Sequence, residues 1–293
     1  MNKIILFARL LRVSHWVKNL FLFIPLFFSG EIFNYSKVYL TSIGFLAFCI
    51  VASSIYILND IKDLEFDKRH EEKSKRPIAA GKITKSTALI LCVLLSIIGL
   101  SISFFLQLNF FFLLVAYFGI NFFYSFGLKN ISILDVILIS CGFAIRIFAG
   151  GFLGDIYITE WLVIMVFLLS LFMAFAKRRD DVLIRNQNGT DIRLASKKYN
   201  LEFINTCISI LAAIVILAYI MYTISPEVIS RFHTDKLYFT SIFVITGILR
   251  YLQLTLVEEN SSSPTKILFK DIFLQVTLIF WILAFYFIIY LNN

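Results

Sequence analysis

The feature that most constrains this chain is a succession of apolar stretches, each about as long as a membrane is thick. A helix needs roughly 20 apolar residues to cross about 30 Å of hydrocarbon. Hydrophobic residues make up 59% of the chain and charged residues only 16%, whereas a soluble domain carries about 25% charged residues. One aqueous core cannot bury so much apolar surface, so lipid has to solvate most of it. The composition therefore predicts an all-α membrane protein.

Nine stretches meet this length requirement, and we expect them to form one bundle over residues 1–293. The stretch nearest the N-terminus is the weakest because Pro25 interrupts it. The expected transmembrane helices cover 16–34, 38–58, 86–106, 109–126, 131–153, 158–177, 202–223, 237–257 and 268–290.

The basic residues predict the orientation of these helices. A net charge of +8 would suit a nucleic-acid partner, but the charges lie in short segments between apolar stretches, which is the pattern of membrane topology. A cytoplasmic N-terminus places the dense basic groups at 3–18, 62–85 and 177–198 inside and leaves only Lys37, Arg231 and Lys236 outside. We therefore expect a cytoplasmic N-terminus and no nucleic-acid partner.

Polar residues concentrate in two segments, 59–85 and 177–201, which we expect to be long cytoplasmic loops. In the first, Asn59, Asp63 and Asp67 are four residues apart, so a helix would place them on one face, with Asp60 alongside. Clustered carboxylates repel one another unless a cation neutralises them. Mg²⁺ prefers oxygen ligands and often shares them with substrate phosphates.

Two interpretations of this segment remain open. Acids at membrane depth are costly and usually functional, which favours a magnesium site at Asn59, Asp60, Asp63 and Asp67. The basic residues from Lys68 to Arg76 would then neutralise the rest of a diphosphate. Alternatively, the segment is a solvated helix end in which the acids pair with Lys62, Lys68 and Arg69, and the basic residues only anchor the membrane interface.

The pattern Asn59-Asp60-x-x-Asp63-x-x-x-Asp67, followed by Arg76-Pro77-Ile78-Ala79-Ala80-Gly81, resembles the first signature of the UbiA-type intramembrane prenyltransferase superfamily. The resemblance covers the whole chain. It implies a nine-helix bundle around a central cavity open to lipid, two motif loops on the cytoplasmic side, Mg²⁺ as cofactor and a place in a bacterial-type inner membrane.

The second polar segment departs from the usual pattern of that superfamily. Lys177, Arg178 and Arg179 precede Asp180 and Asp181, and no Asp-x-x-x-Asp motif is present. Three cations repel a second metal ion but attract a phosphate, unless they only mark the cytoplasmic end of a helix. Arg146 lies within an expected helix. There it either faces the bundle interior and an anion, or locks the helix through backbone carbonyls.

Together these features resemble the decaprenyl-phosphate phosphoribosyltransferase branch of the superfamily, although Val13 stands where that branch usually has proline after arginine. The resemblance implies transfer of phosphoribose from phosphoribosyl diphosphate to a polyprenyl phosphate, with Asp60, Asp63 and Asp67 essential for catalysis. It also implies a set of substrate ligands: Lys18, Asn19, Tyr56, Lys73, Arg76, Tyr124, Lys129, Arg146, Lys177 and Arg178.

Two other functions remain open from the sequence. An ordinary prenyltransferase, with a polyprenyl diphosphate donor and an aromatic or quinone-precursor acceptor, shares the fold and the first motif. A transporter of a lipid-linked sugar would place its charged groups near the midplane rather than at one face. The sequence leaves the prenyl length and the oligomeric state open, a homo-oligomer included.

Overall fold

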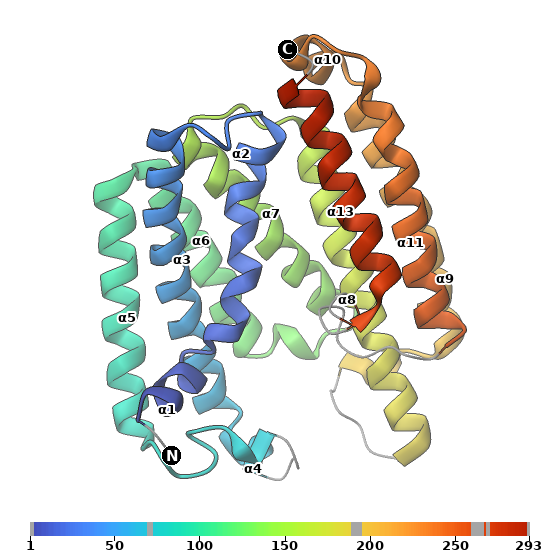
Figure 1. The fold of residues 1–293 in the computed structure, drawn as a ribbon. Coiled ribbons are helices and arrows are strands. Elements are labelled where there is room, and N and C mark those ends of the chain that lie inside the picture. The colour runs from blue at the N-terminus through green and yellow to red at the C-terminus, as the bar shows by residue number, and fades with distance from the viewer. Residues whose placement is uncertain (1–2, 69–72, 189–194, 259–266, 268–269, 292–293) are drawn as a thin grey trace. The chain divides into compact units, whose positions relative to one another are not determined.

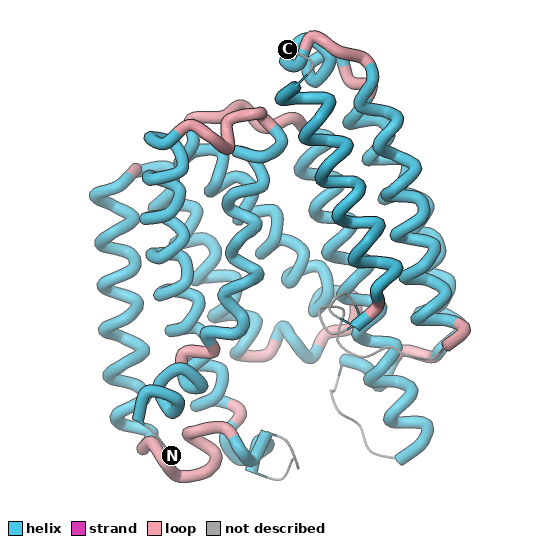
Figure 2. Tube along the Cα trace, in the orientation of Figure 1, coloured by secondary structure: helices cyan, strands magenta, loops and turns pink. Residues whose placement is uncertain are grey.

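The computed structural model describes residues 3–68, 73–188, 195–258, 267 and 270–291, and every regular element among them is helical (Figure 2). Eight helices in this part of the chain are long and apolar enough to cross a membrane. A bent pair near the N-terminus, Ile4–Leu10 with Val13–Phe28, is the candidate for a ninth span. The chain is therefore an all-helical integral membrane protein, as predicted.

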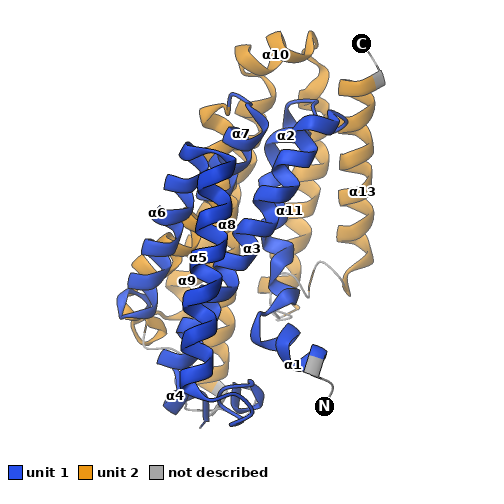
Figure 3. Cartoon of the chain, turned by 90° about the vertical axis from the view of Figure 1, so that its left-hand side faces the viewer, with its two compact units in different colours: residues 1–129, 145–157 blue, residues 130–144, 158–293 orange. Residues whose placement is uncertain are grey.

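The helices form two compact units, shown in two colours in Figure 3. Unit 1 contains residues 1–129 and 145–157, and unit 2 contains residues 130–144 and 158–293. Helix α7 (Leu134–Gly154) contributes its first part to unit 2 and its second part to unit 1.

Unit 1 is built on the long helix α3, which packs against α5 and α6 (Figure 1). The C-terminal end of α3 lies at the same end of the unit as α1 and α4. Besides the second part of α7, the elements are α1 (Lys3–Leu10), the 3₁₀ helix η1 (Val13–Phe23), α2 (Ile24–Phe28), α3 (Tyr35–Lys62), α4 (Leu64–Lys68), η2 (Lys73–Lys75), α5 (Lys85–Leu106), α6 (Leu108–Ser125) and η3 (Leu128–Asn130).

The first predicted helix, 16–34, is wrong in its form. The chain runs through α1, bends by 55° and continues as η1 and the short α2. Arg12, at the bend, has a left-handed backbone with φ 49°. Pro25 stands in the first turn of α2, where its missing N–H breaks no helical hydrogen bond, and the chain changes there from 3₁₀ to α-helix.

Unit 2 packs α8 against α9, and α9 and α13 against α11. Its elements are the first part of α7, α8 (Glu160–Asn188), η4 (Ala195–Lys198), α9 (Leu201–Thr223), α10 (Pro226–Phe232), η5 (Lys236–Thr240), α11 (Ser241–Leu256), α13 (Ile272–Tyr286) and a π turn, η6 (Phe287–Leu291). The predicted loop 177–201 is wrong in its first part, since α8 continues to Asn188. Hydropathy marks where the membrane ends, and the helix runs beyond that point.

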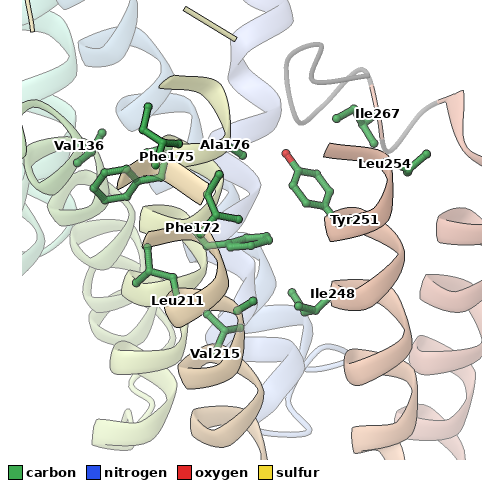
Figure 4. Close-up of a cluster of buried hydrophobic side chains, with 14 of the residues drawn as sticks. Val136, Phe172, Phe175, Ala176, Leu211, Val215, Ile248, Tyr251, Leu254 and Ile267 are labelled. Carbon is green, nitrogen blue, oxygen red and sulfur yellow. The ribbon is translucent and has the colours of Figure 1, made fainter. Parts of the chain in front are cut away.

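Each unit has its own apolar core. In unit 2, Phe172 of α8 lies 5.3 Å from Tyr251 of α11, measured between ring centroids. Figure 4 shows this cluster, with Phe175, Leu211, Val215, Ile248 and Leu254 around the two rings. In unit 1, a smaller cluster joins Leu10 of α1 to Ile57 of α3, Leu64 of α4 and Ile78. Apolar packing of Ile57 and Leu64 therefore fixes the segment between them, which carries Asn59, Asp60 and Asp63.

The 3₁₀ segment lies unusually close to α7. A Cβ atom added at Gly150 would lie 2.8 Å from the carbonyl carbon of Leu22, closer than real Cβ atoms approach. Because a rigid backbone rather than a flexible side chain stands there, even alanine would push the two segments apart.

We predict that Gly150→Ala destabilises the protein by about 1–3 kcal/mol, the usual cost of overpacking. Gly119→Ala is the matched control, because a Cβ at Gly119 meets nothing within 4 Å. The measurement is thermal unfolding of both purified variants in detergent. Equal melting temperatures for the two variants would contradict the close approach of η1 to α7.

Candidate functional site

The acidic residues lie where α3 ends and α4 begins: Asn59 and Asp60 are in the last turn of α3, Asp63 caps that helix, and Asp67 belongs to α4. Helix α3 ends at Lys62, yet the hydrogen-bond pattern continues. The Asp63 N–H donates to the Asn59 carbonyl at 2.9 Å, and the Asp67 N–H donates to the Asp63 carbonyl at 2.8 Å. These hydrogen bonds continue the four-residue repeat past the end of α3. The side chains form two pairs, since Lys129 bonds both Asn59 and Asp63 whereas Arg76 bonds both Asp60 and Asp67. The single face predicted for Asn59, Asp63 and Asp67 stays a prediction.

Each of these carboxylates is paired with a basic side chain from another segment. Asp60 is 2% exposed and accepts hydrogen bonds from Arg12 and, at 3.1 Å, from Arg76. The same Arg76 nitrogen donates to Asp67 at 2.6 Å. Lys129 donates to Asp63 at 2.5 Å and to the Asn59 side-chain oxygen at 3.3 Å. Buried carboxylates are tolerated only when they are paired in this way.

The cations that pair with the acids are not the neighbours that the alternative interpretation names. Lys68 pairs with Glu65 at 3.2 Å, and Lys62 lies over the Phe126 ring at 4.5 Å. Arg69 lies outside the described residues. Arg12 and Lys129 instead reach Asp60 and Asp63 from 48 and 66 residues away, and Arg76 reaches Asp60 and Asp67 from 16 and 9 residues away. This favours a polar site assembled from separate segments of the chain over a solvated helix end.

The side-chain oxygens of Asn59, Asp60, Asp63 and Asp67 have the chemistry that a divalent cation such as Mg²⁺ requires. Within the described ranges, however, no three His, Cys, Asp or Glu side chains converge closely enough to hold a metal ion. In this arrangement the carboxylate oxygens that would bind the ion accept hydrogen bonds from Arg12, Arg76 and Lys129 instead. The donor set fits the ion, and the magnesium site remains a prediction.

A second polar group lies deeper in unit 1, around Arg146 of α7. The Arg146 Nε donates to the Asn19 side-chain oxygen at 2.9 Å, and its Nη2 donates to the Tyr117 hydroxyl at 3.0 Å. The guanidinium carbon lies 4.7 Å from the Phe48 ring centroid and 4.8 Å from that of Tyr117. Arg146 is 4% exposed, so it faces the interior as predicted. Its role as an anion ligand remains a prediction.

The other predicted ligands of unit 1 lie in different surroundings. Tyr56 has the Arg12 guanidinium 5.0 Å from its ring centroid, which places it beside the acidic group. Lys73 lies over the Phe66 ring at 4.9 Å. Lys18 is exposed and Tyr124 is half-buried. The structure therefore brings Tyr56, Arg76 and Lys129 together with the acids and Asn19 together with Arg146.

The sequence interpretation missed Arg12 as a site residue. The available signal was its match to the arginine that the related branch has before proline, at Arg12-Val13. Its contact with Asp60 joins residues 48 apart, so the spacing in the sequence gives no indication of it.

Unit 2 contains a buried ionic cluster around Arg178 of α8. Arg178 is 1% exposed and donates to Asp135 at 2.7 Å and to Asp181 at 3.1 Å. The Tyr199 hydroxyl donates to Asp135 at 3.3 Å and accepts from the Ile133 N–H at 2.5 Å. Burial raises the pKa of Tyr199 to about 12, so this hydroxyl keeps its proton at neutral pH. The cluster ties the start of α7 to α8 and to the residue that follows η4.

The three residues of the basic triplet, Lys177, Arg178 and Arg179, thus lie in three different environments. Arg178 already has two carboxylate partners, which favours a structural role for it. Lys177 is exposed. Arg179 is 3% exposed and donates to the Asn205 side-chain oxygen at 3.0 Å, while its Nη1 has no hydrogen-bond partner in the part of the chain described here. The predicted phosphate-binding roles of Lys177 and Arg178 remain predictions.

Comparison with known proteins agrees with this geometry. The model of the UbiA prenyltransferase family matches residues 20–276. The decaprenyl-phosphate phosphoribosyltransferase of Mycolicibacterium smegmatis is 32% identical over 281 residues, which cover 92% of this chain and 88% of that protein. The enzyme of the same name from Corynebacterium glutamicum is 31% identical, covering 96% and 86%.

Solved structures show the same fold. A UbiA homolog from Archaeoglobus fulgidus bound to GPP and Mg²⁺ superposes with a TM-score of 0.74, covering 97% of this chain and 99% of that chain at 18% identity. The same homolog bound to DMAPP and Mg²⁺ gives a TM-score of 0.72. At this identity the likeness shows the fold alone.

We predict that Arg178→Met destabilises the protein by about 3–5 kcal/mol, because it leaves two buried carboxylates without their cation. Lys177→Met is the matched control, since it removes the same charge from the adjacent, exposed position. Thermal unfolding of the two purified variants measures the difference. If Arg178→Met melts at the temperature of Lys177→Met, the Arg178 ion pairs do not support unit 2.

Proposed function

The chain belongs to the UbiA prenyltransferase family, and on that premise we propose that it transfers 5-phosphoribose from phosphoribosyl diphosphate to a polyprenyl phosphate. Pyrophosphate is released, and the product supplies lipid-linked precursors of cell-envelope polysaccharides. The observation that carries the proposal is the similarity to two decaprenyl-phosphate phosphoribosyltransferases over nearly the whole chain. The basic triplet in place of a second aspartate motif supports the same substrate class.

The acidic end of α3 and its basic partners are suited to binding the donor. A divalent cation held by Asn59, Asp60, Asp63 and Asp67 would stabilise the negative charge on the departing pyrophosphate. Arg76 and Lys129 already lie within hydrogen-bond distance of these acids. They are therefore close enough to neutralise the diphosphate of the donor, and Lys73 is assigned the same role.

The reaction needs few other groups. The bond from ribose C1 to the diphosphate oxygen breaks with its electron pair leaving on pyrophosphate, and an oxygen of the lipid phosphate forms the new bond to C1. Since the acceptor is already an anion, no side chain has to remove a proton. Arg146 and Asn19, held together in the interior of unit 1, are assigned to the lipid phosphate.

The remaining predicted ligands are assigned by resemblance. Lys18 holds the 5-phosphate or the lipid head group, and Tyr56 and Tyr124 line the binding region. The roles of Lys177 and Arg178 have the same basis, and for Arg178 the two carboxylate partners weigh against direct binding.

We further propose that the chain functions as one transferase domain in a bacterial-type inner membrane, with its N-terminus and active site on the cytoplasmic side. The support is the asymmetric distribution of basic residues. They are dense at 3–18, 62–85 and 177–198, which this topology places in the cytoplasm, and only Lys37, Arg231 and Lys236 fall on the other side. The acids from Asp60 to Asp67 lie at and just beyond the end of α3 that this topology places in the cytoplasm.

An ordinary prenyltransferase is the second candidate. The digeranylgeranylglyceryl phosphate synthase of Saccharolobus solfataricus is 31% identical, but over 139 residues that cover 45% of this chain. The missing second aspartate motif separates the two functions, because the sequence has Lys177, Arg178 and Arg179 there and no Asp-x-x-x-Asp pair to hold a second metal ion.

We expect membranes containing the protein to convert radiolabelled phosphoribosyl diphosphate and decaprenyl or undecaprenyl phosphate into a labelled lipid, with release of pyrophosphate and loss of activity on chelation of Mg²⁺. Asp63→Asn is expected to lower the rate at least about 100-fold, because it removes a carboxylate from the leaving-group site. Glu65→Gln is the matched control, since Glu65 is exposed and, among the described residues, pairs with the neighbouring Lys68.

A labelled lipid formed from a polyprenyl diphosphate and an aromatic acceptor, but not from phosphoribosyl diphosphate, would reverse the choice between the two candidates. Full activity of Asp63→Asn in the presence of Mg²⁺ would show that the Asp63 carboxylate is not needed for the reaction.

A further inference from the structure

Arg12 occupies an unusual backbone position at the edge of the acidic group. It stands between α1 and η1, where the chain bends by 55°, and its φ of 49° and ψ of 48° lie in the left-handed region. Residues other than glycine rarely adopt this backbone conformation. Where they do, the surrounding structure holds them in it, often at functional sites. The bend directs the Arg12 side chain across to α3.

The contacts of Arg12 converge on one carboxylate. Its Nη2 donates to the Asp60 Oδ1, the same oxygen that accepts from Arg76 at 3.1 Å. The Tyr56 ring, one turn earlier on α3, lies 5.0 Å from the Arg12 guanidinium carbon. Arg12 is thus held between an aromatic face and a carboxylate that is 2% exposed.

Two guanidinium groups on one carboxylate oxygen leave little room for a metal ion there. Arg76 also pairs with Asp67 at 2.6 Å, so it would keep a carboxylate partner if it left Asp60. Among the described residues, Asp60 is the carboxylate that pairs with Arg12. A divalent ion arriving alone at Asp60 would place its charge next to an unpaired guanidinium, which is unfavourable. An ion arriving with a diphosphate supplies a new anion for that guanidinium.

We propose that Arg12 is a positioning residue that competes with the divalent ion for Asp60 and turns to the anionic donor when both bind. This inference rests on the proposed function, in that it takes Asn59, Asp60, Asp63 and Asp67 to be the metal ligands. Arg12 then makes the binding of the metal ion and of the diphosphate mutually dependent, and by linkage the dependence is reciprocal.

The proposal requires two changes of opposite sign when Arg12 is replaced. The affinity for a divalent ion alone rises, because Asp60 loses a competing cation. The affinity for the donor falls, because the diphosphate loses a cation. A residue that only supports the fold would weaken both.

The experiment titrates purified, substrate-free protein in detergent with Mn²⁺ and follows the free ion by electron paramagnetic resonance. Arg12→Gln is expected to lower the Kd for Mn²⁺ about fivefold, the effect of one partly exposed ion pair of about 1 kcal/mol. At saturating Mg²⁺, the same variant is expected to raise the KM for phosphoribosyl diphosphate by a similar factor.

Arg9→Gln is the matched control, because it removes the same charge from an exposed position on α1. Unchanged or weaker Mn²⁺ binding by Arg12→Gln, or equal tightening in both variants, overturns the proposal. Should Arg12→Gln not fold, Arg12→Lys replaces it, with about twofold tightening expected and no tightening counting against the proposal.

The metal titration needs no substrate. If the wild-type chain transfers no phosphoribose, the proposed function fails, while the Mn²⁺ affinities still decide whether Arg12 competes for Asp60.

Discussion

Unit 1 depends on one electrostatic requirement, which is that carboxylates at the end of a membrane-spanning helix need counter-charges. Asp60 and Asp67 are almost fully buried, and an unpaired carboxylate in such a place is strongly unfavourable. Arg12, Arg76 and Lys129 come from three separate segments to meet this need. The bend before η1, the segment after α4 and the turn after α6 are all positioned by these ion pairs.

Apolar packing holds the same segments from the other side. Leu10 of α1, Leu64 of α4 and Ile78 share one buried cluster with Ile57 of α3. The acidic segment is therefore preorganised by packing while its charges stay balanced by cations. In the function we propose, the site exchanges its internal cations for a metal ion and a diphosphate without building new structure, which is the condition for strong electrostatic stabilisation of a leaving group. Unit 2 applies the same rule with the signs reversed, since the buried Arg178 is paired with Asp135 and Asp181.

Much of this arrangement follows from the sequence because it depends on local periodicity. The length of the apolar stretches predicts the helices from α3 onward, and the four-residue spacing of Asn59, Asp63 and Asp67 matches the backbone hydrogen bonds that join them. The continuation of α8 to Asn188 could not be predicted in this way, because hydropathy reports the membrane boundary and not the helix end. Arg12 and Asp135 could not be predicted either. Their partners lie 48 and 43 residues away, and only tertiary packing selects such pairs.

The central claim is that the oxygens at the end of α3 exchange their internal cations for a divalent ion and a diphosphate. The most direct test is anomalous diffraction from crystals grown with Mn²⁺ and phosphoribosyl diphosphate. The account predicts an anomalous peak about 2.0–2.2 Å from side-chain oxygens among Asn59, Asp60, Asp63 and Asp67, with Arg76 and Lys129 bonded to phosphate oxygens. A bound donor with no metal peak there, and with Arg12, Arg76 and Lys129 still paired to the acids, would contradict it.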